Sequence, residues 1–244
     1  GIPAFDWARR ETWAAAMAGV DAVYVVYQPD LAVPSAPDDI RAFSKIAREQ
    51  GVRKVVLLSG RGVKEAAVAE TIIADSGLEW TFVRAAWFSQ NFSEGDFGFM
   101  TQAGVIALPM GDAVEPIIDA DDIAEVVAVA LTDTSLNDQS LDLSGPEALT
   151  HDQIAGVLSK ATGRKIRYEP ITDDAFRSAL NSLDVLAEYI DLLVYLFDVT
   201  RSGVNAVPTG DVERILGRPA KSFGEFALEA ASEGLLAPQG VTHG

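Results

Sequence analysis

The 244-residue sequence contains no cysteine and only two histidines. The lack of cysteine excludes a disulfide framework, a thiolate metal site and a catalytic thiol. His151 opens an expected helix and His243 lies near the carboxyl terminus, so the histidines form no ligand pattern and we expect no metal. No apolar run approaches the roughly 20 residues that span a membrane, and no signal peptide opens the chain. We therefore expect a soluble, cytoplasmic protein without membrane association.

Positive charge is also scarce, because 19 Lys and Arg stand against 36 Asp and Glu, for a net charge of −17. Basic side chains drive binding to a phosphate backbone, so we expect no nucleic-acid partner. Hydrophobic residues make up 48% of the chain and charged residues 23%. This balance is typical of a soluble globular protein with a sizeable buried core.

The first third of the chain alternates apolar, β-branched segments with amphipathic ones. Residues 21–27, 54–59 and 80–84 predict strands buried on both faces, and residues 37–51 and 63–75 predict helices. This alternation is typical of a parallel sheet in a doubly wound α/β domain. Ligands bind beyond the carboxyl ends of such strands, so we expect the functional site in the loops that follow them.

The second half predicts a smaller, α-rich lobe. Short strands are expected at 105–108, 139–143 and 166–171, and helices at 119–131, 150–163 and 172–197. Thr150 and Gln153 have the spacing of a capping box at the start of one of these helices. The expected division is a cofactor domain of residues 1–104 and 112–145, and a substrate or lid lobe of residues 105–111 and 146–244.

Several strings occur in a fixed order over about the whole chain. They are VDAVY (20–24), GVRKVVLLS (51–59), SGLEWTFVR (76–84), WFSQNF (87–92), DADDIA (119–124), SGPEALT (144–150), ATGRK (161–165) and GRP (217–219). Together they resemble the NmrA-like family of atypical short-chain dehydrogenases/reductases. The resemblance implies a Rossmann-like domain that binds NAD(P)H, with NADP favoured over NAD, and a smaller α-rich C-terminal substrate lobe.

Two features of the family pattern are missing from this sequence. No GxxGxxG loop follows a strand, so the resemblance implies that about 30–45 residues, roughly one βαβ unit, precede Gly1 in the functional protein. No Tyr-x-x-x-Lys pair is present, because no tyrosine occurs between Tyr27 and Tyr168. The usual tyrosine general acid of short-chain dehydrogenases is therefore absent.

The strand-end loops supply the candidate site residues. The resemblance favours cofactor contacts from Tyr27, Gln28, Pro29, Ser59, Gly60, Arg61, Ala85, Ala86, Trp87 and Phe88. It favours acceptor contacts from Trp87, Asn91 and Phe92. Lys64, expected one turn into a helix, is the candidate catalytic residue, which would replace the missing acid or bind a phosphate or ribose of the cofactor. The alternative is a solvated lysine that pairs with Glu65 or a neighbouring acid.

Two functions remain open at this point. One is an NAD(P)H-dependent reductase of a small apolar acceptor such as a quinone, azo compound, imine or enone, since these take hydride without a strong protein acid. The other is a non-catalytic NAD(P)-sensing protein that acts through a protein partner. The segment 183–197, rich in Leu, Tyr and Val, is expected either to roof the acceptor site or to form a homodimer face.

Overall fold

The computed structural model describes residues 4–95 and 97–238, which form two compact units. Among the described residues, unit 1 comprises 4–85 and 123–143, and unit 2 comprises 86–95, 97–122 and 144–238. The predicted division into a cofactor domain and a substrate lobe concerns function and stays a prediction.

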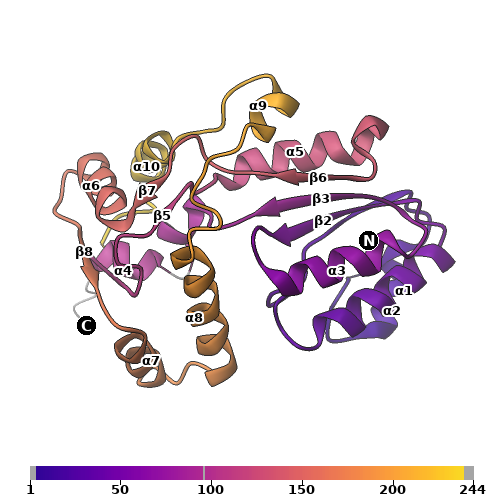
Figure 1. The fold of residues 1–244 in the computed structure, drawn as a ribbon, viewed down its shortest axis with the longest axis horizontal. Helices are drawn as coiled ribbons and strands as arrows, with labels where there is room; N and C mark the ends of the chain where they lie inside the picture. Colours follow the sequence, from indigo (N-terminus) through magenta and orange to yellow (C-terminus); the bar gives the residue numbers. More distant parts are fainter. Residues whose placement is uncertain (1–3, 96, 239–244) are drawn as a thin grey trace. The chain divides into compact units, whose positions relative to one another are not determined.

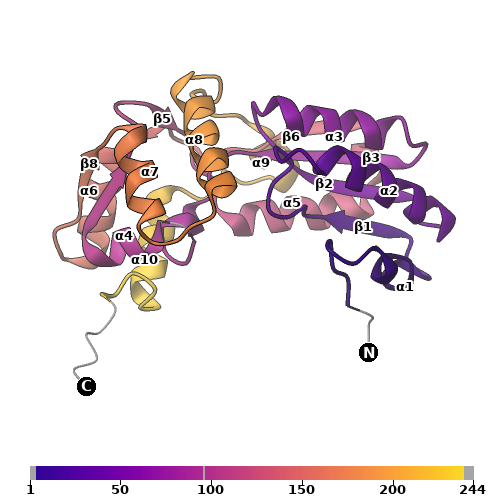
Figure 2. The same ribbon diagram turned by 90° about the horizontal axis from the view of Figure 1, so that it is seen from below.

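Unit 1 is built on a parallel sheet with the strand order β1-β2-β3-β6 in the described residues. Its strands are β1 (Ala22–Val25), β2 (Lys54–Gly60), β3 (Glu79–Ala85) and β6 (Gln139–Asp142). The helices are η1 (Arg10–Thr12), α1 (Trp13–Met17), α2 (Ala36–Glu49), α3 (Lys64–Ala74), α5 (Ala120–Thr132) and η3 (Thr134–Leu136). Helices α2 and α3 cover one face of the sheet and α5 covers the other (Figures 1 and 2). The doubly wound α/β class is confirmed.

Burial differs between the strands of this sheet. In β2, Val55, Val56 and Leu57 are all 0% exposed, as the apolar run predicts. The expectation that the segment 21–27 is buried on both faces is wrong, because Tyr24 is 39% and Val26 is 42% exposed. Among the described residues β1 pairs with β2 alone, and an edge strand leaves side chains within reach of water.

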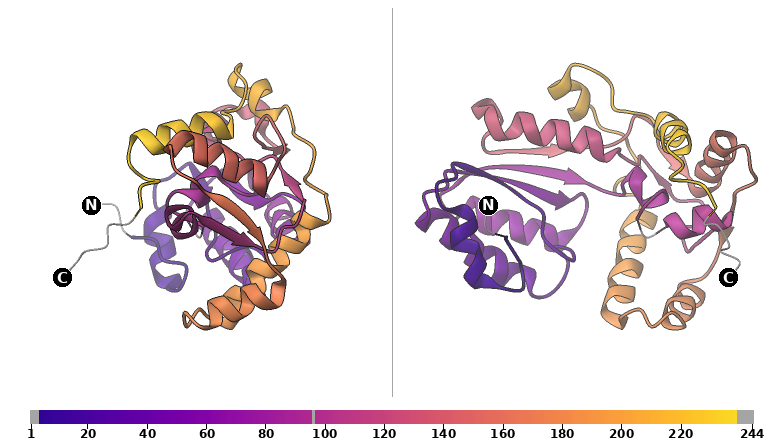
Figure 3. Two further views of the ribbon diagram at one scale, coloured as in Figure 1. Left: turned by 90° about the vertical axis from the view of Figure 1, so that its left-hand side faces the viewer. Right: turned by 180° about the vertical axis from the view of Figure 1, so that it is seen from behind.

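Unit 2 has two short ladders and a helical core. Its strands are β4 (Val105–Leu108), β5 (Val114–Glu115), β7 (Leu149–Thr150) and β8 (Arg167–Pro170). Its helices are η2 (Ser89–Phe92), α4 (Gly98–Ala103), α6 (His151–Thr162), α7 (Asp173–Asn181), α8 (Ala187–Arg201), α9 (Asp211–Leu216) and α10 (Phe223–Ser232). Strand β4 pairs with β8 in parallel and β5 with β7 in antiparallel fashion. Helices α6 and α10 lie side by side (Figure 3).

The sequence predicted the start of α6 correctly, but it predicted one long helix where unit 2 has two, α7 and α8. Thr150 accepts from the Gln153 amide at 3.2 Å while the Gln153 side chain accepts from the Thr150 amide at 2.8 Å, so the capping box is confirmed. The single helix predicted over 172–197 is wrong. It is divided into α7 and α8 by a turn in which Asp184 has a φ of 55°, a left-handed conformation that aspartate tolerates better than most residues.

Candidate functional site

The carboxyl ends of β2 and β3 bring two predicted segments of unit 1 together. Ser59 lies beside Arg84 and Gly60 beside Ala85 in the parallel register. Beyond the ladder, the Arg61 amide donates to the Ala85 carbonyl at 2.9 Å. The loops after the two strands are therefore joined at the edge of the sheet where doubly wound proteins bind ligands.

The end of β1 carries a tyrosine whose hydroxyl is already engaged. Tyr27 is 6% exposed, and its hydroxyl donates to Oδ2 of Asp39 at 2.8 Å, with Oγ of Ser35 at 3.2 Å. Burial is the main cause that raises the pKa of Tyr27, and the Asp39 carboxylate raises it further. Tyr27 therefore stays protonated at neutral pH, with its hydrogen directed to a carboxylate.

A cavity of about 740 Å³ opens beside this strand end. Its lining contains three predicted cofactor residues, Tyr27, Gln28 and Pro29. The remaining lining residues are Ala4, Phe5, Asp6, Trp7, Ala8, Arg9, Ser35 and Asp39. The sequence reasoning missed the 4–9 segment as part of this cavity. The available signal was its pair of aromatic residues, since Trp7 packs edge-on against Tyr27 with ring centroids 4.8 Å apart.

Ser59, a predicted cofactor contact, uses its hydroxyl hydrogen inside the protein. Its Oγ donates to Oε1 of Glu70 at 2.6 Å, and Glu70 also accepts from Nε and Nη2 of Arg84 at 2.9 and 2.6 Å. These hydrogen bonds are the largest cause of the raised pKa of Arg84. The Ser59 side chain, in a residue that is 4% exposed, has no hydroxyl hydrogen left to donate to a ligand.

Glu70 is the buried acid that the sequence reasoning missed. It is 5% exposed and lies on the sheet-facing side of α3 with Ala66, Ala69 and Ile73. A carboxylate inside an apolar helical stripe was the available signal, because an acid is rarely buried without a cationic partner.

Lys64 is the first residue of α3, rather than one turn into the helix as expected. Its side chain is exposed, and no described residue pairs with it, Glu65 included. A cation at a helix N-terminus gains nothing from the helix dipole. Because it is exposed and unpaired among the described residues, the Lys64 ammonium group is accessible to a ligand. It lies at the start of α3, close in the chain to the predicted cofactor residues Ser59, Gly60 and Arg61.

The predicted acceptor residues lie in the first segment of unit 2. Trp87 is half-buried, and its ring stacks on Phe197 and is tilted against Phe97. Phe92 is 1% exposed and packs in the core, with its ring centroid 5.5 Å from that of Phe223. Ala86, Phe88 and Asn91 are half-exposed. Trp87, Phe88 and Asn91 thus retain surface for a ligand, whereas the Phe92 ring is enclosed by protein.

Hydrogen bonds connect residues 87–90 to residues 118–120, at the start of α5. The Ser89 amide donates to the Ile118 carbonyl at 2.8 Å, and the Ile118 amide donates to the Trp87 carbonyl at 3.1 Å. The Gln90 side chain donates to Oδ1 of Asp119 at 3.1 Å and accepts from the amide of Ala120 at 2.9 Å. The backbone that carries Trp87 is therefore held at several points.

Buried carboxylates at the start of α5 are paired with cations from the chain before α10. Asp122, 1% exposed, accepts from Nη1 of Arg218 at 2.7 Å and from the Lys221 amide at 2.7 Å. Oδ2 of Asp119, 0% exposed, lies 3.5 Å from Nζ of Lys221. Burial by itself would lower the pKa of Lys221, but the hydrogen bond to Glu229 and the neighbouring aspartates raise it well above its usual range. Both carboxylates lie at the start of α5, where these cations and the helix dipole stabilise them.

His151 is a buried, neutral imidazole at the first position of α6. It is 3% exposed between the rings of Phe92 and Tyr168, and its Nδ1 has no hydrogen-bond partner among the described residues. Burial lowers its pKa from 6.5 to about 4. A proton therefore binds to the His151 imidazole less readily in the folded protein than in the unfolded chain.

We expect the free energy of unfolding to rise with pH between pH 4 and 6.5 because of His151. In that window the imidazole is protonated in the unfolded chain and neutral in the folded one, which corresponds to a loss on the order of 3 kcal/mol on acidification. Urea unfolding of the wild type and His151→Gln at several pH values measures it. The difference between the two proteins should change with pH across this window, and a constant difference would contradict the assignment.

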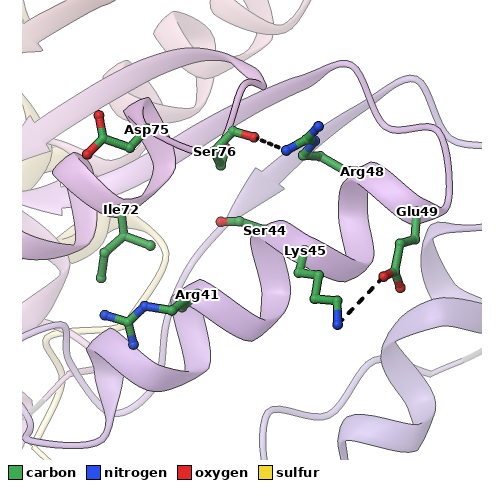
Figure 4. A pocket seen from close by; sticks show the side chains of 8 residues that line it. All are labelled: Arg41, Ser44, Lys45, Arg48, Glu49, Ile72, Asp75 and Ser76. Carbon is green, nitrogen blue, oxygen red and sulfur yellow. Dashed lines mark hydrogen bonds and ion pairs between the residues drawn. The ribbon is translucent and has the colours of Figure 1, made fainter.

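A second groove, also of about 740 Å³, lies between α2 and α3 on the flank of the sheet (Figure 4). Its lining residues are Arg41, Ser44, Lys45, Arg48, Glu49, Ile72, Asp75 and Ser76. The cations are engaged locally: Arg41 pairs with Asp38 at 2.7 Å, Lys45 lies 3.9 Å from Glu49, and Arg48 donates to the Ser76 carbonyl at 2.7 Å. This groove contains none of the predicted site residues.

The structure describes residues 4–95 and 97–238 of the chain. Within these ranges no cluster of three or more His, Asp or Glu side chains is arranged to hold a metal ion. No helix there has the length and apolar character needed to cross a bilayer.

Solved structures share this fold. The NADPH-dependent quinone oxidoreductase of Escherichia coli, complexed with NADPH, matches with a TM-score of 0.79 and 20% identity, over 93% of this chain and 82% of that one. The Citrobacter sp. triphenylmethane reductase, complexed with NADP(H), matches with a TM-score of 0.77 and 17% identity over the same shares. Both likenesses confirm the Rossmann-like fold.

Sequence comparison establishes the family. An NAD(P)H azoreductase of Xenophilus azovorans is 30% identical over 242 residues, which are 93% of this chain and 81% of the relative. A (4-alkanoyl-5-oxo-2,5-dihydrofuran-3-yl)methyl phosphate reductase of Streptomyces griseus is 34% identical over 230 residues, which are 88% of this chain and 78% of the relative. The NmrA-like family model matches residues 4–206. The chain belongs to the NmrA-like family.

Proposed function

We propose that this protein is an NAD(P)H-dependent reductase that delivers hydride to a small apolar acceptor such as a quinone, azo compound, imine or enone. Membership in a family whose members include an NAD(P)H azoreductase supports the proposal. NADP is favoured over NAD because the two structural neighbours are complexes with NADP(H) and NADPH.

The cofactor would be held by the strand-end loops of unit 1. Tyr27, Gln28 and Pro29 line the cavity of about 740 Å³, which provides room for a ligand beside the sheet edge. Gly60 and Arg61 lie in the next loop, and a Cβ on Gly60 would meet Cγ2 of Val63 at 2.9 Å, so a larger residue there would have to displace the Val63 side chain. Lys64 would contribute a positive charge to the phosphates or ribose. Ala85 and Ala86 continue the same edge.

The acceptor would be bound by Trp87 and Asn91 of unit 2, and Phe88, expected to contact the cofactor, lies next to Trp87 in the chain. Trp87 and Phe88 offer flat apolar surface, and Asn91 offers an amide for a polar group of the acceptor. The proposed acceptor role of Phe92 would require its enclosed ring to become accessible.

The observation that carries the choice of acceptor is the state of the two hydroxyl groups at the strand ends. The Tyr27 hydroxyl donates to Asp39 and the Ser59 hydroxyl donates to Glu70, so neither hydrogen is available to a substrate carbonyl. The reduced dinucleotide supplies the hydride. The protein's part is to bind and orient the two reactants, which suits acceptors that gain their proton from water.

Turnover of NADPH by the purified protein against a panel of quinones, azo dyes, iminium compounds and enones tests the proposal. We expect oxidation at 340 nm with at least one acceptor class and faster turnover with NADPH than with NADH. Dinucleotide binding without turnover of any acceptor would overturn the reductase function and favour the sensing alternative. The absence of nucleic-acid binding is part of the proposal and is supported by the net charge of −17. A cytoplasmic location is also part of the proposal.

A further inference from the structure

The Trp87 ring is held in its plane by two aromatic neighbours. It stacks on Phe197 with ring centroids 5.4 Å apart and an interplanar angle of 22°, and it meets Phe97 at 5.4 Å and 44°. Stacking restricts the plane of the ring, but a rotation of about 180° about the Cβ–Cγ bond keeps that plane and moves the N–H edge to the opposite side. Another interaction must therefore select the rotational setting of this half-buried indole.

That interaction is a hydrogen bond to α8. Nε1–H of Trp87 donates to Oγ1 of Thr200 at 2.8 Å, across 113 positions in the chain. Thr200 is 2% exposed, and its own hydroxyl hydrogen is directed to the Leu196 carbonyl at 3.2 Å in the same helix. The oxygen of the buried Thr200 thus presents an acceptor to the indole N–H.

The end of α8 that carries Thr200 is itself anchored. Arg201, the last residue of the helix, donates to Oδ1 and Oδ2 of Asp173 at 2.9 and 3.0 Å and also pairs with Asp198. Two parallel N–H···O bonds fix position as well as direction. The hydroxyl that receives the indole hydrogen is consequently a fixed point within unit 2.

We propose that Thr200 is a positioning residue that sets the rotation of the Trp87 indole and thereby the acceptor geometry and preference of the enzyme. The inference rests on the proposed function, in which Trp87 contacts the acceptor. Without the Thr200 oxygen, the indole N–H would be buried unpaired, and the ring would turn until its N–H reaches water. The surface offered to a flat acceptor would change with that rotation.

Thr200→Val and Thr200→Ser test the inference as a pair. Valine has the shape of threonine without the hydroxyl, whereas serine keeps the hydroxyl and loses the methyl group. For Thr200→Val we expect kcat/KM for the acceptor to fall about tenfold, mainly through KM, with the Kd for NADPH unchanged. For Thr200→Ser, which keeps the hydroxyl group, we expect kcat/KM for the acceptor to stay near the wild-type value. Thr162→Val is the matched control, because Thr162 makes the same kind of bond within its helix, to the Leu158 carbonyl at 2.7 Å.

The indole N–H resonance of Trp87, assigned with Trp87→Phe, gives a readout that needs no turnover. It should shift, and exchange faster with water, in Thr200→Val but not in Thr200→Ser. Unchanged acceptor kinetics in Thr200→Val, or an equal loss in Thr200→Ser, would overturn the positioning role. A wild-type protein that turns over no acceptor would overturn the proposed reductase function, and with it the positioning role of Thr200. Failure of the proposed function is thus seen in the wild type, whereas failure of the positioning role alone is seen only in the Thr200 variants.

Discussion

Gly145→Ala is expected to lower the free energy of unfolding by about 3 kcal/mol or more, because overpacking against backbone leaves little room for relaxation. A Cβ at this buried position would lie 2.1 Å from the Ile117 carbonyl oxygen and 3.1 Å from its carbon. The Gly145 amide also donates to the Pro116 carbonyl at 3.0 Å, so the two backbones are hydrogen-bonded at the point of closest approach.

The facing backbone cannot move away without breaking other bonds. Ile118, the next residue, exchanges hydrogen bonds with the backbone of Trp87 and Ser89 at 3.1 and 2.8 Å. A shift of residues 116–118 would therefore also displace the segment that carries the proposed acceptor residues. We expect Gly145→Ala to reduce acceptor binding in whatever fraction of the protein still folds.

Gly156→Ala is the matched control for this prediction. Gly156 lies within α6, is exposed, and has no heavy atom within 4 Å of a built Cβ. Because alanine is favoured over glycine in a helix interior, this variant should gain up to about 1 kcal/mol. Urea unfolding of both variants measures the contrast. Changes of the same sign in both variants would contradict the assigned role of the Gly145 contact.

Trp87→Ala is expected to lower kcat/KM for the acceptor on the order of 100-fold, while the Kd for the dinucleotide stays near the wild-type value. The indole is half-buried against Phe97 and Phe197, and removal of a large buried aromatic side chain costs roughly 3–5 kcal/mol in protein cores. Part of that cost falls on folding and part on the acceptor, so unfolding must be measured alongside the kinetics.

Trp80→Ala provides the comparison for Trp87→Ala. Trp80 lies in β3 of unit 1, where it stacks on Phe82 with ring centroids 4.1 Å apart. Its removal should destabilise the fold without a selective effect on the acceptor. If Trp87→Ala unfolds the protein, or if both variants lose acceptor activity equally, Trp87 is a packing residue and the proposed acceptor site is wrong.

The sequence predicted the elements that depend on near neighbours. The buried strand at 54–59, the α3 helix and the Thr150 capping box all follow from patterns within a few residues. The helix predicted over 172–197 failed because five residues form a turn between α7 and α8 inside a continuous helix-like pattern. The left-handed Asp184 carries no distinctive signal of its own in the sequence.

The candidate site was predicted only as far as strand ends could be placed. Topology brings the loops after β2 and β3 together, and this required no side-chain detail. The hydrogen-bond partners of the site could not be derived in the same way. Ser59 is engaged by Glu70, and Trp87 by Thr200, at separations of 11 and 113 positions. Such pairings depend on how elements pack, which a single sequence does not specify.

The pairing of Asp122 with Arg218 connects the start of α5 to a part of the chain that lies beyond the family match. The family match stops at residue 206, yet the cations that neutralise Asp119 and Asp122 come from residues 218 and 221. The core of unit 2 further includes Phe223 and Phe226 of α10, at 1% and 4% exposure. A fragment cut at the family boundary would keep two buried carboxylates without their cations. A fragment ending at residue 206 would therefore also lack side chains of the unit 2 core, so the family match covers only part of that core.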